Sequence, residues 1–320
     1  MDRTIVVTLP ALSEAHRSRM TEAARAKGFN VLFFDSEQAA ASAAAEAEIL
    51  FSGSGDLANN CPKLRWQCTP SAGVNQFLGK ERFASPEMML TNSSGAYGVT
   101  IAEHVIMITL EVLRRQMEYS EIVRRREWTR NLPVRSIRNS RIAVLGTGDI
   151  GRECTIRLRA FGPASITGVN RSGRNPEGLF DRIVLQDEMD AVLRETDILI
   201  ITLPGTDETF HMLDSRRLGL LPDRALLVNV GRGTVVDQRA LEKELRAGRL
   251  YAALDVFEQE PLPPEDSLWD CPNLLMAPHV AGNMTLPYTR DRIVELFLED
   301  FENYCAGRPL ARRVNLGKGY

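Results

Sequence analysis

The chain has 320 residues, 25% of them charged, and a formal net charge of −3. This length predicts two domains, each large enough to form its own core. The nearly balanced charge argues against nucleic-acid and acidic-membrane partners, because neither would meet an extended basic field. The arginine run at 124–128 is better explained as a solvated helix face or as an arm that contacts another subunit.

The cysteines and the N-terminal residues indicate in which cellular compartment the protein is expected. The five cysteines form no C-x-x-C pair, which is typical of neither a disulfide framework nor a zinc site. The first ten residues, MDRTIVVTLP, show no basic segment followed by a long apolar run, so we expect no secretory signal. No window of about 18 residues is continuously apolar, so we expect no membrane span. These features predict a cytoplasmic protein without a metal.

Short apolar runs alternate with helical stretches in the first third of the chain. A helix is expected at 12–28, where Gly28 would end it, and an alanine-rich surface helix at 41–48. Such alternation predicts a parallel sheet covered by helices on both faces. The expected strands are 4–8, 30–34, 48–51, 64–68 and 88–92.

A long amphipathic pattern separates this region from a second alternating series. Residues 100–128 are apolar at three- and four-residue steps, which predicts one helix that crosses between domains. From about Pro287, another amphipathic helix and a tail are expected to pack on the N-terminal domain. Six or seven strands between these helices are what a dinucleotide-binding domain requires. They are expected at 141–146, 165–170, 182–185, 197–202, 225–230, 251–255 and 274–278.

The motif GTGDIG stands between the first strand and the first helix of this second series. Its glycines, Gly146, Gly148 and Gly151, have separate roles: a tight turn, close approach of a pyrophosphate, and close packing of helix on strand. Together with Asp149 and Ile150, they would place the phosphates at a helix N-terminus, where amide donors and partial positive charge are available. This context predicts a nicotinamide dinucleotide site rather than a glycine-rich turn without a ligand.

The next strand, SITGVN, ends without an acid at its carboxyl end. NAD-preferring sites carry Asp or Glu there, hydrogen-bonded to the ribose 2′-hydroxyl. This chain has Asn170, Arg171 and Ser172 instead. A guanidinium and a hydroxyl suit the 2′-phosphate of NADP, and Arg174 follows closely. We therefore predict NADP as the cofactor, with NAD possible and an ordinary exposed arginine loop as the alternative.

Three later segments place chemistry beyond consecutive strands. Arg232 follows the strand at 225–230, Asp255 and Glu260 follow the next, and His279 follows the last. Because parallel strands end at one edge of a sheet, a cation, carboxylates and an imidazole would meet there. Taken alone, Arg232 would indicate a surface salt bridge and His279 a structural histidine. The segment that contains Asp255 and Glu260 would indicate an acidic solvated loop.

The order of these motifs resembles the D-isomer-specific 2-hydroxyacid dehydrogenases, which include glyoxylate/hydroxypyruvate reductases and phosphoglycerate dehydrogenases. The resemblance implies an α/β fold in which a Rossmann dinucleotide-binding domain, residues 100–287, is inserted in a smaller flavodoxin-like α/β substrate domain, residues 1–99 and 288–320. It also implies a homodimer, with the long helix and its arm at the contact. The motifs that carry it are SAGVN, TIAEH, GTGDIG, LPGTDET, VNVGRG, DVFEQEP and PHVAG.

The resemblance also implies residue roles. Arg232 matches the arginine that holds the substrate carboxylate and polarises the oxo group, and His279 the acid that protonates the oxo oxygen. Glu260 matches the carboxylate that pairs with that histidine and favours its charged form. The amides of Ala72 and Gly73 match a carboxylate cradle. The remaining matches are cofactor contacts, at Leu203, Pro204 and Thr209 for the adenosine and at Val230 and Asp255 for the nicotinamide.

The chain is therefore predicted to be an NADP-preferring oxidoreductase of small 2-oxo or D-2-hydroxy acids such as glyoxylate and hydroxypyruvate. An NAD-dependent D-2-hydroxyacid or D-3-phosphoglycerate dehydrogenase is the alternative within enzymes. A nucleotide-sensing interaction protein of the same fold is the alternative outside them. No chemistry is assigned to His16, His104 or His211.

Overall fold

The computed structural model describes residues 3–77, 83 and 87–316. The chain divides into two compact units, which are Met1–Tyr97 with Met284–Tyr320, and Gly98–Asn283. The division expected from the sequence places these boundaries after residues 99 and 287. Parts of the expected substrate domain lie outside the described residues, namely 1–2, 78–82, 84–86 and 317–320.

The first unit is a five-stranded parallel sheet in the order β2-β1-β3-β4-β5. This is the flavodoxin-like order, so the predicted fold of this unit is confirmed. Its strands are β1 (Arg3–Val7), β2 (Phe29–Phe33), β3 (Ala47–Phe51), β4 (Trp66–Cys68) and β5 (Met89–Thr91). Its helices are α1 (Glu14–Ala26), α2 (Glu37–Ala44), α3 (Gly55–Asn59), the short η1 (Asn75–Phe77) and α10 (Pro287–Cys305). The alanine-rich helix, α2, begins and ends earlier than expected, because Ser36 caps it and β3 follows.

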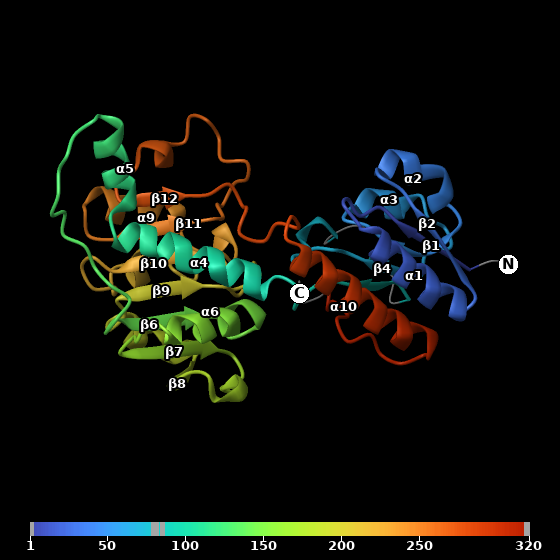
Figure 1. Cartoon of the computed structure of the whole chain (residues 1–320). Helices are drawn as coiled ribbons and strands as arrows, with labels where there is room; N and C mark the ends of the chain where they lie inside the picture. The colour runs from blue at the N-terminus through green and yellow to red at the C-terminus, as the bar shows by residue number, and fades with distance from the viewer. Residues whose placement is uncertain (1–2, 78–82, 84–86, 317–320) are drawn as a thin grey trace. The chain divides into compact units, whose positions relative to one another are not determined.

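The C-terminal helix α10 packs on the N-terminal strands, as the sequence predicts (Figure 1). Phe297 stacks on Phe51 and Trp66, with ring centroids 4.5 and 5.3 Å away. Tyr304 donates a 2.6 Å hydrogen bond to Glu48, which also pairs with Arg3. The apolar stripe of α10 thus completes the core of the first unit.

The second unit is a seven-stranded parallel sheet in the order β12-β11-β10-β9-β6-β7-β8. Counted within the unit, the order is 7-6-5-4-1-2-3, which is the Rossmann arrangement with one further strand. The predicted fold class is confirmed. The strands are β6 (Arg141–Leu145), β7 (Ser165–Asn170), β8 (Arg182–Leu185), β9 (Ile198–Ile201), β10 (Leu226–Asn229), β11 (Tyr251–Leu254) and β12 (Leu274–Met276).

Helices cover both faces of this sheet (Figure 1). They are α4 (Gly98–Leu113), α5 (Gln116–Arg124), α6 (Asp149–Arg159), α7 (Met189–Leu193), α8 (Ser215–Leu218) and α9 (Gln238–Arg246), with short helical turns η3 to η6 at Pro176–Gly178, Gln186–Glu188, Gly233–Val235 and Ser267–Asp270. Strands β6 and β9 are neighbours, and the connections leave them in opposite directions. Ligands of such sheets bind beyond the carboxyl ends of the strands at this switch point.

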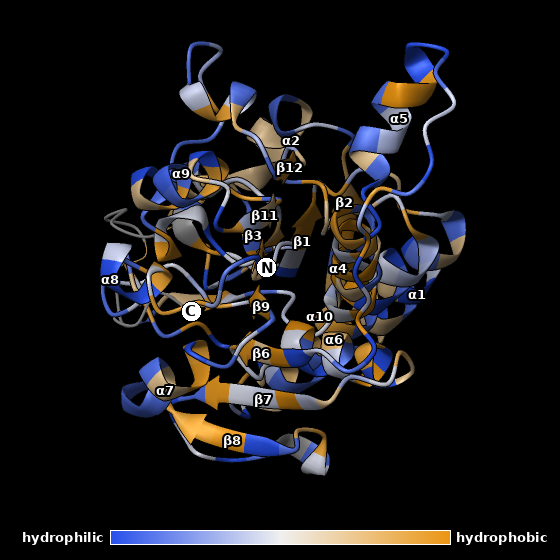
Figure 2. Ribbon diagram, turned by 90° about the vertical axis from the view of Figure 1, so that its left-hand side faces the viewer, coloured by the Kyte–Doolittle hydropathy of each residue, from blue (hydrophilic) through white to orange (hydrophobic). Residues whose placement is uncertain are grey.

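The prediction of one long helix over 100–128 is wrong. The helix breaks at Arg115, whose φ of 58° is left-handed, and the second piece ends at Arg124. Leaving the helix lets Arg115 pair with Glu118 and donate to the Tyr251 hydroxyl at 3.3 Å. Helix α4 is mostly apolar along its length, as the orange colour of Figure 2 shows, and it belongs wholly to the second unit rather than crossing between units.

Candidate active site

The three glycines after β6 differ in their surroundings. Gly146 turns the chain with a φ of 96°, and a Cβ on Gly151 would overlap the carbonyl oxygen of Gly146. Nothing lies within 4 Å of the position that a Cβ on Gly148 would take. The loop is therefore closed on the sheet side and open beside Gly148, the N-cap residue of α6. An open N-terminus of an 11-residue helix fits a pyrophosphate.

Asp149, the first residue of α6, has its side chain beside the start of α4. Its carboxylate atoms lie 2.7 Å from the position of a Cβ on Gly98, the first residue of α4. A carboxylate at a helix N-terminus is favourable because of the partial positive charge there. Asp149 thus joins the starts of α4 and α6, while Ile150 beside it is half-buried.

The tip of β7 is built by Asn170. Its amide group donates to Thr147 Oγ1 at 2.7 Å and to the carbonyl of Arg174 at 2.9 Å. Its oxygen accepts from the backbone amides of Ser172 and Gly173 at 3.1 and 2.7 Å. This side chain therefore shapes the turn and ties it to the glycine loop, a role that the search for a ribose ligand missed.

Arg171 is the exposed cation of this turn. Its Nη1 lies 3.0 Å from Oε2 of Glu208, in the loop after β9, and the two side chains are 54% and 68% exposed. The Ser172 hydroxyl accepts from the amide of Arg174 at 3.3 Å. A guanidinium and a hydroxyl thus stand where the sequence predicts them.

The loop after β9 is held by Thr209. Its buried hydroxyl donates to the carbonyl of Pro204 at 2.7 Å and accepts from the amide of Thr206 at 2.9 Å. Leu203 at the start of the loop is half-buried and packs against the core of the unit. The loop is a compact turn that presents Glu208 to solvent.

His279 and Glu260 are in contact at the other end of the sheet. Nδ1 of His279 lies 2.6 Å from Oε2 of Glu260, whose Oε1 accepts from the amide of Phe257 at 2.8 Å. An anionic Glu260 makes Nδ1 the donor, which leaves Nε2 as the atom for proton exchange. The side chain of His279 is 49% exposed.

Asp255 holds the segment that carries this histidine. Its carboxylate accepts from the amide of Val280 at 2.8 Å and from that of Ala281 at 3.0 Å, and its carbonyl accepts from the amide of His279 at 2.9 Å. Burial raises the pKa of Asp255, and the amide hydrogen bonds and nearby His104 and His279 only partly offset this. These bonds support the left-handed φ of 52° at His279.

His104, given no chemistry from the sequence, lies beside this carboxylate. Its Nε2 is 3.7 Å from Oδ1 of Asp255 and makes no hydrogen bond among the described residues. The side chain comes from α4, far from Asp255 in the sequence. The one signal for His104 in the sequence was its place in the TIAEH motif. A single histidine in a predicted helix does not indicate which residues it will contact in the fold.

Arg232 leaves the end of β10 in a tightly packed loop. Its Nη1 donates to the carbonyl of Gly231 at 2.7 Å, and Asn229 donates to the carbonyl of Arg232 at 3.0 Å. Burial lowers the pKa of Arg232 and the charge of Glu260 raises it, but a guanidinium stays protonated. A largely desolvated cation favours an anionic partner such as a carboxylate. Val230, just before this loop, is buried.

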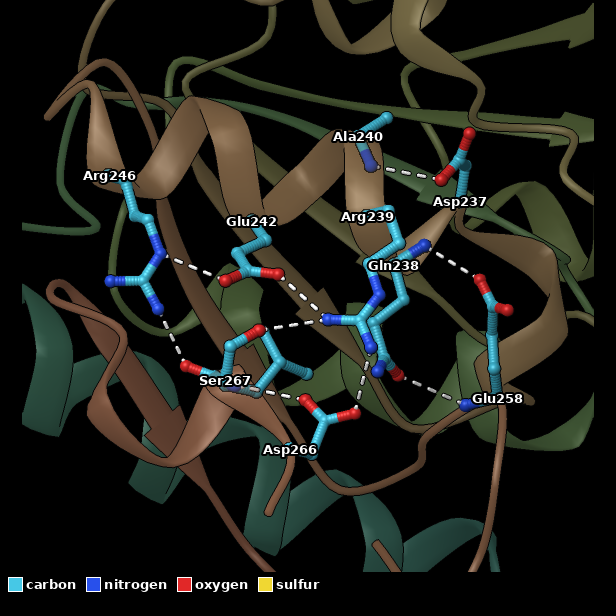
Figure 3. A network of polar contacts seen from close by, with 10 residues as sticks. Asp237, Gln238, Arg239, Ala240, Glu242, Arg246, Glu258, Asp266 and Ser267 are labelled. Carbon is cyan, nitrogen blue, oxygen red and sulfur yellow. Dashed lines mark hydrogen bonds and ion pairs between the residues drawn. The ribbon is translucent and has the colours of Figure 1, made fainter. Parts of the chain in front are cut away.

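The loops that carry Arg232 and Glu260 pack against each other. A Cβ on Gly233 would overlap the backbone of Phe257, so only glycine allows this approach. Beside it, Glu258 accepts from the amide of Gln238 at 2.7 Å and donates its own amide to that side chain at 3.2 Å (Figure 3). The network continues along α9 through Arg239, Glu242, Arg246, Asp266 and Ser267.

The predicted carboxylate cradle lies in the first unit, after β4. The carbonyl of Ala72 accepts from Asn92 Nδ2 at 2.8 Å, and the carbonyl of Gly73 accepts from the Ser71 hydroxyl at 2.7 Å. These bonds orient the peptide that carries the amide of Gly73 and the peptide that follows it.

Three comparisons place the chain among known proteins. The family described as D-isomer specific 2-hydroxyacid dehydrogenase, NAD binding domain, matches residues 106–281. A glyoxylate/hydroxypyruvate reductase B of Yersinia enterocolitica is 31% identical over 292 residues, 88% of each chain. Another from Serratia proteamaculans is 33% identical over 227 residues, 69% of each chain. The chain belongs to the D-isomer-specific 2-hydroxyacid dehydrogenase family.

Solved structures agree with this assignment. A family protein from Aeromonas salmonicida is 30% identical, with a TM-score of 0.86 over 99% of this chain and 100% of that one. An NADPH-dependent glyoxylate/hydroxypyruvate reductase from Sinorhizobium meliloti, solved with NADP and sulfate, shares the fold at 24% identity and a TM-score of 0.81, with each chain wholly covered. This dehydrogenase is therefore an NAD(P)-dependent enzyme of 2-hydroxy or 2-oxo acids.

Residues 3–77, 83 and 87–316 contain no helix long and apolar enough to cross a membrane. The same residues contain no group of three or more His, Cys, Asp or Glu side chains that could hold a metal ion.

Proposed function

We propose that this dehydrogenase reduces small 2-oxo acids such as glyoxylate and hydroxypyruvate, prefers NADPH, and uses His279 as its proton donor. The observation that carries the proposal is the 2.6 Å contact between His279 Nδ1 and Glu260, because it leaves Nε2 as the atom that exchanges a proton. The printed names of the Yersinia and Serratia relatives support this substrate class.

The chain's own groups can perform most of the reaction. A bound nicotinamide would supply the hydride that reaches the carbonyl carbon. Arg232 would bind the substrate carboxylate and polarise the oxo group, and the amides of Ala72 and Gly73 would also bind a carboxylate. His279 would give its Nε2 proton to the oxo oxygen, and Glu260 would stabilise the imidazolium before transfer. A positioned general acid contributes about 10²- to 10⁴-fold to a rate.

The cofactor preference rests on the tip of β7. No carboxylate occurs from Val169 to Ser172, so nothing in this turn would repel a 2′-phosphate. Arg171 and Ser172 would bind that phosphate through its oxygens. Further proposed contacts are with the pyrophosphate, adenosine and nicotinamide, at Gly146, Gly148, Asp149, Ile150, Gly151, Asn170, Leu203, Pro204, Thr209, Val230 and Asp255.

The test compares NADPH and NADH in the reduction of glyoxylate and of hydroxypyruvate. We expect a higher kcat/KM with NADPH, and we expect Arg171→Ala to lower that value about tenfold or more while changing the NADH value little. Arg182→Ala, which replaces an exposed arginine at the first residue of β8, is the matched control. Higher efficiency with NADH in the natural chain would contradict the cofactor preference, and no turnover with either acid would contradict the substrate class.

We also propose a homodimer whose contact includes the segment after α4. Val123, Trp128 and Val134 are 66%, 88% and 45% exposed, which is unusual for apolar side chains on one short segment. A second copy of this chain would cover them. Light scattering should give twice the mass of 35.7 kDa, and Trp128→Glu should weaken the association. A monomer at micromolar concentration would contradict this.

The cytoplasm is the proposed compartment. The five cysteines are free thiols, and four of them are buried. Free thiols persist where glutathione and thioredoxin keep the surroundings reducing. Fractionation of the source cells, with a periplasmic and a cytoplasmic marker enzyme, tests this proposal.

A further inference from the structure

The turn after β7 contains no carboxylate, and Glu208 from the loop after β9 brings one beside it. Glu208 lies in this loop shortly before Phe210 and His211, whose rings stack on each other. Its Oε2 is 3.0 Å from Nη1 of Arg171. The neighbouring Thr209 is buried and fixes the loop through Pro204. The acid is thus presented to Arg171 from an anchored segment, although its own side chain is exposed.

Carboxylates and phosphates bind a guanidinium through the same nitrogens. Glu208 takes one of the five N–H donors of Arg171 and places a negative charge beside its guanidinium, so a 2′-phosphate at this position would meet fewer donors and a second anion. Both side chains of the pair are more than half exposed, and a pair of this kind is weak because water screens both charges. It is therefore weak enough to be exchanged when a dianionic phosphate arrives.

We propose that Glu208 sets the ratio of NADPH to NADH affinity by competing with the 2′-phosphate for Arg171. The inference rests on the proposed function, since it takes Arg171 as the ligand of that phosphate. When NADPH binds, Arg171 moves from Glu208 to the 2′-phosphate. The carboxylate of Glu208 then repels this phosphate. With NADH, the pair stays closed. Glu208 is a specificity-determining residue that acts through Arg171.

The opposite role, in which Glu208 orients Arg171 for the phosphate, is less favoured by the geometry. The contact with Glu208 runs through Nη1, and the two side chains are 54% and 68% exposed. An ion pair between two exposed side chains holds its geometry weakly, so it contributes little to orienting the guanidinium. Competition and repulsion should therefore outweigh orientation.

The experiment measures binding without turnover. NADPH and NADH are titrated by their fluorescence, and adenosine 2′,5′-bisphosphate is titrated as a competitor, with the natural chain, Glu208→Gln, Arg171→Ala and the double variant. Glu208→Gln should tighten NADPH and the bisphosphate about threefold to tenfold and leave NADH within about twofold. In the Arg171→Ala background this gain should fall below about twofold. Asp207→Asn, the adjacent exposed acid, is the matched control.

The outcomes separate the inference from the proposed function. Weaker NADPH binding by Glu208→Gln, an equal gain for NADH, or the full gain without Arg171 would each overturn competition. If Arg171→Ala leaves NADPH binding unchanged, the assignment of the 2′-phosphate site fails and the inference fails with it. If the natural chain prefers NADH but Glu208→Gln shifts the ratio toward NADPH through Arg171, the proposed preference fails and the inference holds.

Discussion

The seven-stranded sheet holds its candidate functional side chains differently at two places, the exposed end at the tip of β7 and the packed end at the tips of β10 to β12. At the tip of β7, an exposed turn is shaped by the side chain of Asn170, and its cation is paired with an exposed acid. At the tips of β10 to β12, backbone packs directly on backbone, and the buried Asp255 fixes the segment of His279. If the proposed function holds, reaction geometry is built into the core, whereas cofactor discrimination lies on a surface that single substitutions can alter.

The largest expected effect is at the packed end. His279→Ala removes the proposed proton donor, so kcat should fall about 10²- to 10⁴-fold. NADPH binding should change little, because this side chain pairs with Glu260 and not with the glycine loop. Stopped-flow reduction of glyoxylate and fluorescence titration of NADPH measure the two quantities.

His211→Ala is the control for this experiment. His211 also contacts a glutamate, Glu258, with Nε2 3.1 Å from the carboxylate, but it belongs to the loop after β9. It should keep nearly full activity. A His279→Ala variant within about fivefold of the natural rate would mean that another group, or water, donates the proton.

The second largest effect is expected from adding a side chain at Gly233, where the loops that carry Arg232 and Glu260 are in contact. Gly233→Ala should lower the free energy of unfolding by about 3 kcal/mol or more, because the overlapping atoms of Phe257 are backbone and cannot rotate away. It should also displace Arg232 and reduce kcat/KM. Gly53→Ala, where nothing lies within 4 Å of the new Cβ, should be nearly neutral in the same urea denaturation. Equal stability of the two variants would contradict the packing argument.

Asp255→Asn tests the buried carboxylate with a smaller effect. Replacing an acceptor oxygen by an amide group opposite the amide of Ala281 should cost about 1–3 kcal/mol. Because burial raises the pKa of Asp255 in the folded state, its contribution is full below the unfolded pKa of about 3.9 and declines as the pH rises through the folded value. The stability deficit of the variant should therefore shrink as the pH rises from about 4. A deficit that grows over this range would show that folding stabilises the charged form.

The sequence predicted one end of the sheet better than the other. The strands follow from the apolar runs, whereas the two fold types and the pairing of His279 with Glu260 were implied by the resemblance to a known family. The break at Arg115 was missed because its partner Tyr251 is distant in the chain. Glu208 and His104 were missed for the same reason. A motif shows which residues follow a strand, but only the fold shows which side chains then meet.

The smallest expected effect is at the exposed end. Asn170→Ala removes the side-chain bonds that form the β7 turn and join it to Thr147, and its cost should be about 1 kcal/mol because the turn amides can bond to water instead. Both cofactors should bind more weakly, since Thr147 belongs to the glycine loop, but NADPH should lose more, because Arg171 and Ser172 lose their fixed backbone. Titration of both nucleotides against Asn170→Ala and Asn170→Asp separates turn from charge. Asp can still accept from the amides of Ser172 and Gly173 and from the Thr147 hydroxyl, but it loses the bond to the Arg174 carbonyl, so it should keep most of the turn and weaken NADPH far more than NADH. If Asn170→Asp instead binds NADPH as the natural chain does, the 2′-phosphate does not lie at this tip.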